Sequence, residues 1–200
     1  MRVIAGKYGS RRLHTLRGTA LRPTSDRLRE TLFNILGPAI EDAVFVDVFA
    51  GSGAVGIEAL SRGARQVIFI ENHPAGTALL RRNLASLGIA AGSAVTAPAK
   101  TFPGTAELLA LDAAAGLERL VARRIRADIV FADPPYGDLD AYDTVLELLG
   151  ESELLAKDGF AVIEHSRRHT LPTVVGQIER IRCVEQGDAA LSFYHLVLAA

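Results

Sequence analysis

The sequence predicts an α/β domain built on a mixed, mostly parallel sheet, because short apolar runs alternate with longer helical patterns. Five of these runs are rich in β-branched or aromatic residues, which is typical of strands buried on both faces. Two further runs at the C-terminus flank a tight turn and indicate an antiparallel hairpin. We therefore expect a seven-stranded mixed sheet with helices on both faces and a small N-terminal extension.

Strands and helices are expected in regular alternation from residue 43 onward. The five expected strands cover residues 43–49, 66–71, 107–112, 127–133 and 159–165, and the hairpin joins 178–185 to 190–198 through Gly187 and Asp188. The expected helices cover residues 55–62, 74–87, 113–126 and 141–149. Residues 88–105 are rich in turn-forming residues and are expected to form a loop.

Residues 1–37 are predicted to form a separate basic extension, followed by the main domain over residues 38–200. Residues 2–5 and 11–14 are expected as two short strands, and a helix over 26–36 can be capped by the hydroxyl of Thr24 or Ser25. Residues 1–30 carry a net charge of +6, whereas the remaining 170 residues carry −7. This asymmetry indicates nucleic-acid binding, although a solvated basic arm fits it equally well.

Composition excludes several classes of protein. The chain of 200 residues is 49% hydrophobic and 22% charged, which is ordinary for a protein with a buried core. A single cysteine, Cys183, cannot form an internal disulfide and fits a reducing compartment. No signal peptide is evident, and no apolar stretch reaches the roughly 20 residues that span a bilayer. We expect a cytoplasmic protein without a membrane partner.

A glycine-rich turn follows the first expected strand, at residues 47–56. Gly51, Gly53 and Gly56 allow a sharp turn and a close approach of the backbone to a ligand, although this spacing also fits a plain strand–helix turn. Glu71, at the end of the second strand, can accept hydrogen bonds from ribose hydroxyls of a nucleotide or nucleoside cofactor. Asp112 can accept a hydrogen bond from an adenine amino group, and it can also cap the helix that follows it, since one role does not exclude the other.

The sequence Asp133-Pro134-Pro135-Tyr136 follows the fourth expected strand directly. Two consecutive prolines hold a stiff turn, so that the Asp133 carboxylate and the Pro134 carbonyl can direct two acceptors to one point. An aromatic amino group has two N–H donors, and Tyr136 offers a face on which an unpaired base can stack. This pattern predicts chemistry on the amino group of a nucleic-acid base.

These segments together resemble the RsmD family, which methylates the N2 amino group of a guanine in 16S (small-subunit) ribosomal RNA. The resemblance rests on residues 2–13, 21–36, 46–64, 68–72 and 131–136, and so spans nearly the whole chain. It implies a class I, Rossmann-like methyltransferase fold and S-adenosyl-L-methionine as the cofactor, with S-adenosylhomocysteine as its product. It also implies ribosomal RNA or the small ribosomal subunit as the partner.

The resemblance assigns a role to each candidate site residue. The cofactor would be held by Asp47, Phe49, Ala50, Gly51, Ser52, Gly53, Glu71, Asn72, Asp112 and Asp133. The target base would be held by Asp133, Pro134, Pro135 and Tyr136. The RNA would be bound by Arg2, Lys7, Arg11, Arg12, Arg22, Thr24 and Arg27. Because residues 88–106 depart from the family pattern, the position of the third strand and the role of Asp112 stay open.

Three other functions fit part of the pattern. A DNA adenine-N6 methyltransferase shares the Asp-Pro-Pro-Tyr logic but usually carries a separate target-recognition segment. An NAD-dependent oxidoreductase explains the glycine turn and Glu71 but leaves residues 133–136 unexplained. An inactive RNA-binding protein on the same fold leaves the cofactor turn without a purpose. We expect neither a metal site nor an obligate oligomer, and a monomer is the simplest expectation.

Overall fold

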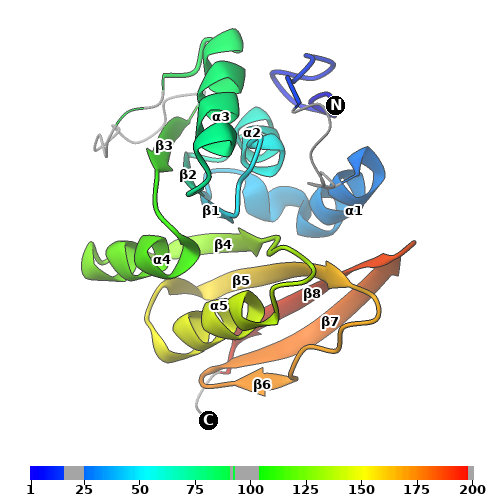
Figure 1. Cartoon of the computed structure of the whole chain (residues 1–200), viewed down its shortest axis with the longest axis vertical. Coiled ribbons are helices and arrows are strands. Elements are labelled where there is room, and N and C mark those ends of the chain that lie inside the picture. The colour runs from blue at the N-terminus through cyan, green and yellow to red at the C-terminus, as the bar shows by residue number, and fades with distance from the viewer. Residues whose placement is uncertain (16–24, 91, 93–103, 198–200) are drawn as a thin grey trace.

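The computed structural model describes residues 1–15, 25–90, 92 and 104–197. A mixed sheet forms the centre, with the spatial strand order β3-β2-β1-β4-β5-β8-β7-β6 (Figure 1). The strands are β1 (Val44–Val48), β2 (Gln66–Ile70), β3 (Thr105–Leu109), β4 (Ala127–Ala132), β5 (Leu155–Ser166), β6 (Val174–Val175), β7 (Ile178–Gln186) and β8 (Ala189–Leu196). Strands β1 to β5 pair in parallel, and β8, β7 and β6 extend the sheet in antiparallel fashion.

Helices cover both faces of the sheet. They are α1 (Asp26–Leu36), the short 3-10 helix η1 (Gly37–Ile40), α2 (Ala54–Ser61), α3 (Pro74–Ser86), α4 (Ala113–Ala122) and α5 (Leu139–Glu151). Helices α1, α2 and α3 lie on one face, and α4 and α5 lie on the other (Figure 1). The predicted α/β class with helices on both faces is therefore confirmed.

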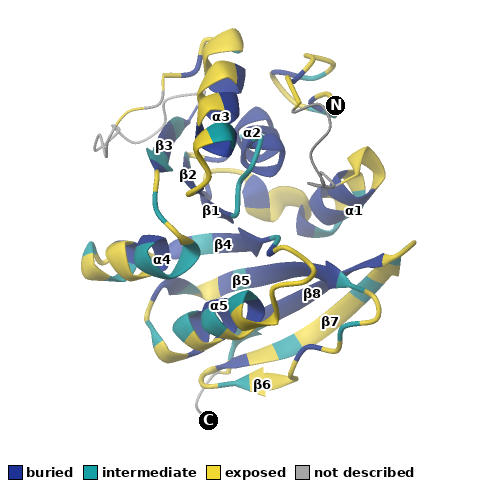
Figure 2. Cartoon of the chain, viewed as in Figure 1, coloured by how far each residue is buried: buried dark blue, intermediate teal, exposed yellow. Residues whose placement is uncertain are grey.

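Alternation along each strand divides the buried side chains between two cores. On β1, Phe45 belongs to the core beneath α1–α3, whereas Val46 belongs to the core beneath α4 and α5. On β2, Phe69 and Ile68 are divided in the same way. Because both faces are covered, these strands are apolar throughout, and the centre of the sheet is buried along its length (Figure 2).

Among the described residues, the sheet has eight strands rather than the seven predicted. The additional strand, β6, is only two residues long and pairs with the start of β7. Two residues are too few to produce a recognisable periodic pattern, which is why the sequence did not indicate them. The C-terminal hairpin of β7 and β8 is confirmed, with Gly187 in the left-handed region at its turn.

The third strand begins and ends earlier than predicted. It covers residues 105–109 rather than 107–112, so Asp112 lies three residues beyond the strand. The Asp112 carboxylate accepts a hydrogen bond from Ala115 N at 2.8 Å and caps α4. Capping therefore pulls this part of the chain out of the sheet and into the start of the helix.

The two strands predicted in the N-terminal arm are reduced to an isolated antiparallel bridge between Arg2 and Arg12. The physical reason is that the next donors are taken by another element. Ile4 N and Ala5 N donate to the carboxylate of Glu58 on α2, at 2.7 Å and 3.0 Å. The helix over 26–36 is confirmed, with Ser25 as its cap and an acceptor for Leu28 N.

Within the part of the chain that the structure describes, no helix is long and apolar enough to cross a bilayer.

Helix α1 packs into the same core as the N-terminal arm. Val3, Tyr8 and Leu13 of the arm are buried beside Leu32 and Phe33 of α1. The arm, α1 and the sheet share this core. The predicted division of the chain at residue 37 stays a prediction.

Candidate active site at the carboxyl edge of the sheet

Strand register aligns the chain segments that the sequence singled out. Val48 pairs with Ile70 of β2 and with Ala132 of β4, and Ala132 pairs with Ile163 of β5. The residues that come next on these strands, among them Phe49, Glu71 and Asp133, therefore lie along one edge. Ligands of open α/β sheets bind at this carboxyl edge, where the strand order reverses between β1 and β4.

The glycine turn adopts a backbone that few other residues tolerate. Gly51 and Gly53 have φ values of +54° and +76°, and Phe49, which is not glycine, has a φ of +62°. A Cβ on Gly53 would lie 2.1 Å from Leu80 Cδ1, so the chain packs against α3 there. A Cβ on Gly51 would meet only Phe49 O, at an ordinary contact distance of 3.9 Å, so there is room for a further group beside this glycine. Left-handed backbone at a non-glycine residue is typical of ligand-binding turns.

Asp47 is a buried carboxyl group beneath the glycine turn. It is 2% exposed, and its Oδ2 accepts a hydrogen bond from Gly56 N at 2.8 Å, in the first turn of α2. Burial raises the pKa of Asp47 to about 7, the Gly56 bond opposes this, and nearby Glu71 adds to it. A cationic group brought to this carboxyl would favour its ionised form.

Glu71 links the second strand to the glycine turn. One carboxylate oxygen accepts from Gly51 N at 2.7 Å, and the other accepts from His73 N at 2.7 Å. A carboxylate has about four acceptor positions, so each oxygen keeps capacity for a further donor such as a hydroxyl. Asn72 follows as an exposed side chain, and Asp112 is exposed at the start of α4. Helix capping by Asp112 is thus observed, and it leaves acceptor capacity on the carboxylate.

The Asp133–Tyr136 segment follows β4, and its residues differ in how far they are exposed to solvent. Asp133 is half-buried and its N–H faces Val48 O at 3.4 Å; Pro134 is buried; Pro135 and Tyr136 are exposed. Tyr142 of α5 is completely buried, and its hydroxyl donates to the Pro134 carbonyl at 3.2 Å. The carbonyl is therefore held in place from the inner side, while the aromatic ring of Tyr136 stays accessible at 38% exposure.

The N-terminal arm presents its basic side chains to solvent. Four of the predicted RNA-binding residues of the arm, together with Arg27 of α1, are exposed: Arg2, Lys7, Arg11, Arg12 and Arg27. Arg22 and Thr24 lie outside the described residues. Arg29, which contributed to the charge of the basic segment, is completely buried and donates to Arg2 O at 2.5 Å and to Asp26 Oδ1 at 3.0 Å. Its guanidinium group therefore stabilises the packing of the arm and is not accessible to an RNA phosphate.

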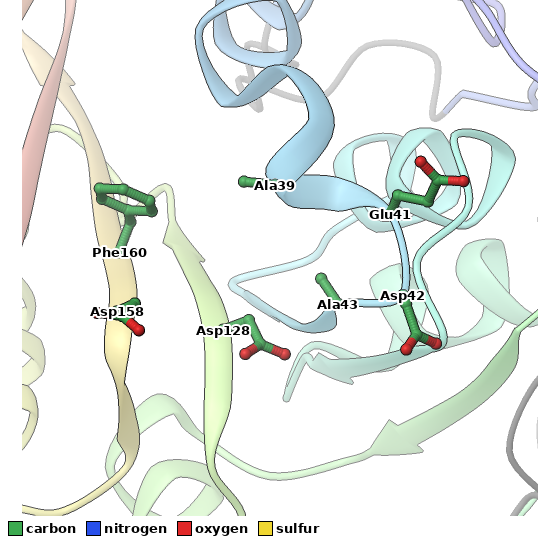
Figure 3. Close-up of a pocket in the computed structure, with 7 residues that line it drawn as sticks. All are labelled: Ala39, Glu41, Asp42, Ala43, Asp128, Asp158 and Phe160. Carbon is green, nitrogen blue, oxygen red and sulfur yellow. The ribbon is translucent and has the colours of Figure 1, made fainter.

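An acidic pocket lies at the opposite edge of the sheet, away from all of these groups. Figure 3 shows its lining, which consists of Ala39, Glu41, Asp42, Ala43, Asp128, Asp158 and Phe160. Asp128 is occupied by a structural bond, since its Oδ2 accepts from Val44 N at 2.8 Å. Among the described residues, no group of three or more His, Cys, Asp or Glu side chains is arranged to hold a metal ion.

Three buried polar residues near the candidate site were not singled out from the sequence: Asn83, Tyr142 and Glu164. Glu164 follows Ile163, the β5 partner of Ala132, and is 4% exposed. Asn83 lies in the last turn of α3, still inside the helix, where asparagine is unfavourable unless its side chain is bonded elsewhere. That misfit was a usable signal in the sequence for Asn83, whereas a tyrosine on an apolar helix face gives none.

The family model described as "Conserved hypothetical protein 95" matches residues 1–195 of the chain. Ribosomal RNA small subunit methyltransferase D of Escherichia coli K12 is 34% identical over 194 residues, which cover 97% of this chain and 89% of that protein. The chain belongs to the RsmD family.

Two solved structures share the fold of this chain. A hypothetical protein of Thermus thermophilus matches with a TM-score of 0.78 and 28% identity, over 98% of this chain and 99% of that one. The rRNA methyltransferase aviRa of Streptomyces viridochromogenes matches with a TM-score of 0.63 and 18% identity, over 90% of this chain and 88% of that one. The second likeness shows that this RsmD-family chain has the Rossmann-like methyltransferase fold that was predicted.

Proposed function

We propose that this chain transfers a methyl group from S-adenosyl-L-methionine to the exocyclic N2 amino group of a guanine in 16S ribosomal RNA. One observation carries the proposal: β1 and β4 are neighbours in register, so Asp133 and Pro134 emerge beside the glycine turn. A cofactor on the turn and a base on the Asp133 segment would then be adjacent. Membership of a family with relatives named Ribosomal RNA small subunit methyltransferase D supports the RNA substrate.

The residues at the carboxyl edge fit the proposed cofactor. Gly51 leaves room for a further group beside it, and Glu71 retains acceptor capacity for the ribose hydroxyls. Asp47 would face the cationic amino group of the methionine part, with Phe49, Ala50, Ser52 and Gly53 forming the wall around it. Asn72 and Asp112 would border the adenine. When bound, this cofactor supplies a methyl group already activated on a sulfonium, so the protein needs only to orient and to stabilise.

The Asp133 segment would orient the target amino group. The carboxylate of Asp133 and the carbonyl of Pro134 would each accept one of its N–H bonds, which turns the nitrogen lone pair away from the ring and toward the methyl group. Asp133 would stabilise the positive charge that develops on nitrogen and then take its proton. Stacking on Tyr136 would hold the base, a contact worth roughly 1–3 kcal/mol for a single base.

The basic extension would supply most of the affinity for RNA. Its exposed cations suit phosphate contacts, which give affinity without reading sequence and weaken steeply with salt. We therefore assign residues 1–37 as the RNA-binding extension and residues 38–200 as the methyltransferase domain, acting in the cytoplasm as a monomer. No step in this scheme requires a metal.

Methyl transfer from labelled S-adenosylmethionine tests the proposal. Small ribosomal subunits, naked 16S ribosomal RNA and duplex DNA are offered side by side. Label in RNA is expected with subunits, naked RNA or both. Label in DNA adenine alone would replace the proposed substrate by DNA, and binding of NAD rather than S-adenosylhomocysteine would overturn the reaction class.

A further inference from the structure

Asn83 joins the N-terminal arm to the glycine turn through a single buried amide. Its side chain is completely buried on α3. Oδ1 accepts from His14 N at 2.8 Å, and Nδ2 donates to His14 O at 3.2 Å. The amide therefore pairs with both backbone groups of His14, as a residue of a neighbouring strand would. The same Nδ2 donates to Ser52 O at 2.9 Å, within the glycine turn. One planar group therefore contacts both segments.

The orientation of this amide is fixed by its partners. Rotating it by half a turn would direct Nδ2 at the N–H of His14, a donor facing a donor, and would leave the Ser52 carbonyl without its bond. Both N–H groups of Asn83 are committed, one to each segment. If either segment moves away, one buried N–H of Asn83 loses its acceptor. The segment that stays in place cannot replace this acceptor, because it already pairs with the other N–H.

The arm has further anchors, and they lie on α2, the helix that begins directly after the glycine turn. Glu58 accepts from Ile4 N and Ala5 N, and Ser61 Oγ accepts from Tyr8 N at 2.9 Å. A Cβ on Gly6 would lie 1.9 Å from Ser61 O, so the arm lies directly against this helix. The arm is thus attached to α2 and α3, and Asn83 of α3 also contacts the turn itself through Ser52 O.

We propose that Asn83 is a positioning residue that couples the cofactor turn to the RNA-binding arm, so that cofactor and RNA bind with positive cooperativity. This inference rests on the proposed function. A cofactor that orders the backbone at Ser52 also fixes the amide, which then meets the arm at His14 in one orientation. Because coupling is reciprocal, RNA on the arm strengthens cofactor binding by the same factor. We expect a factor of about 5-fold or more.

The test measures binding in pairs on the full chain. The affinities for naked 16S ribosomal RNA and for the small ribosomal subunit are measured with and without saturating S-adenosylhomocysteine. The affinity for S-adenosylhomocysteine is measured with and without each of these two RNA partners. The wild type is expected to show equal factors of about 5-fold or more in both directions. In Asn83→Ala the factor is expected to approach one. Gln177→Ala, which changes an exposed amide between β6 and β7 outside the RNA-binding extension, is expected to keep the wild-type factor.

Proteolysis of the wild type provides a measurement that needs no variant. S-adenosylhomocysteine is expected to slow tryptic cleavage after Arg11 and Arg12 of the arm more than cleavage after the exposed Arg167 and Arg168. If Asn83 were merely structural, Asn83→Ala would lower the stability and the affinities for RNA and for S-adenosylhomocysteine. The factor by which each ligand strengthens binding of the other would stay at the wild-type value. If Asn83→Ala fails to fold, the proteolysis comparison on the wild type still tests whether the cofactor turn is coupled to the arm.

The outcomes separate the two proposals. Binding of both ligands with affinities that do not depend on each other would overturn the coupling and leave the proposed function intact. A wild-type factor retained in Asn83→Ala would overturn the role of Asn83. Equal protection of all tryptic sites would contradict the link between turn and arm. Binding of S-adenosylhomocysteine with no affinity for either naked 16S ribosomal RNA or the small ribosomal subunit would contradict the proposed function itself.

Discussion

The hydroxyl of Tyr142 donates a hydrogen bond to the carbonyl of Pro134 at 3.2 Å, from a completely buried position on α5. Burial is the main cause that raises the pKa of Tyr142, so the hydroxyl stays protonated and remains a donor. This bond engages one lone pair of the carbonyl and leaves the second for the amino group of a target base. The inner side of the proposed catalytic turn, residues 133–136, is therefore fixed by a residue outside this motif.

Replacing Tyr142 by phenylalanine is expected to reduce kcat by about 5- to 10-fold, which corresponds to roughly 1 kcal/mol of lost positioning. The KM for RNA and the affinity for S-adenosylhomocysteine are expected to stay unchanged. Tyr194→Phe is the matched control, because the buried Tyr194 hydroxyl also donates to a proline carbonyl, that of Pro172 at 2.7 Å. Both variants are expected to lose about 1 kcal/mol of stability. A kcat loss of equal size in both would refute a specific role for Tyr142.

The raised pKa of Asp47 predicts a pH-dependent stability. Its ordinary value is 3.8 and its value in the folded protein is about 7, so the folded state holds this proton more tightly than the unfolded chain. The stabilising contribution of the protonated group is complete below about pH 4 and is lost as the pH rises to about 7. Relative to Asp47→Asn, the free energy of unfolding of the wild type is therefore expected to fall across this range, by up to about 4 kcal/mol. Urea unfolding of both proteins measures the difference, and parallel pH profiles would disprove it.

Two glycines of the same turn are expected to respond differently to alanine. Gly53→Ala places a methyl group 2.1 Å from Leu80 Cδ1 at a φ of +76°, and is expected to cost about 2–4 kcal/mol of stability. Gly51→Ala meets no such obstacle and is expected to cost only about 1 kcal/mol through its φ of +54°. Because its methyl projects into the space proposed for the cofactor, it is expected to weaken S-adenosylhomocysteine binding at least about tenfold, or 1.4 kcal/mol. Calorimetric binding that equals the wild type would move the cofactor away from this turn.

Glu58 is predicted to control the docking of the arm. Completely buried, it accepts from Ile4 N, Ala5 N and Arg62 Nε, the last at 2.8 Å. Glu58→Ala leaves these donors unpaired and is expected to cost about 3–5 kcal/mol in chemical unfolding, with faster tryptic cleavage of the arm. Glu151→Ala, an exposed carboxylate at the end of α5, is the control and is expected to change stability by less than about 0.5 kcal/mol. A small effect of Glu58→Ala would mean that the arm is held by other contacts.

The parallel part of the fold and the placement of the site were predictable because both follow from local patterns. Buried parallel strands are apolar throughout, and the polar residues that follow them meet at one edge whatever the detail of the loops. The glycine turn, Glu71 and Asp133 were found in this way, since each comes directly after such a strand.

The features that were missed depend on contacts distant in the chain. The predicted strands of the arm give way because Glu58, 54 positions from Ile4, takes their donors. The third strand ends early because Asp112 caps a helix, and a carboxylate at a strand end and one at a helix cap look alike in sequence. Asn83 meets His14 from 69 positions away, so its role emerges only when α3 packs against the arm.

Asp133 is proposed to direct methyl transfer to a guanine amino group in ribosomal RNA. The most direct measurement digests 16S ribosomal RNA to nucleosides after reaction with labelled S-adenosylmethionine, using wild type and Asp133→Ala. The label of the wild-type reaction is expected to elute as N2-methylguanosine. In Asp133→Ala this label is expected to fall at least about a hundredfold, while S-adenosylhomocysteine still binds. Label in another nucleoside, or activity near the wild-type level in Asp133→Ala, would contradict this proposal.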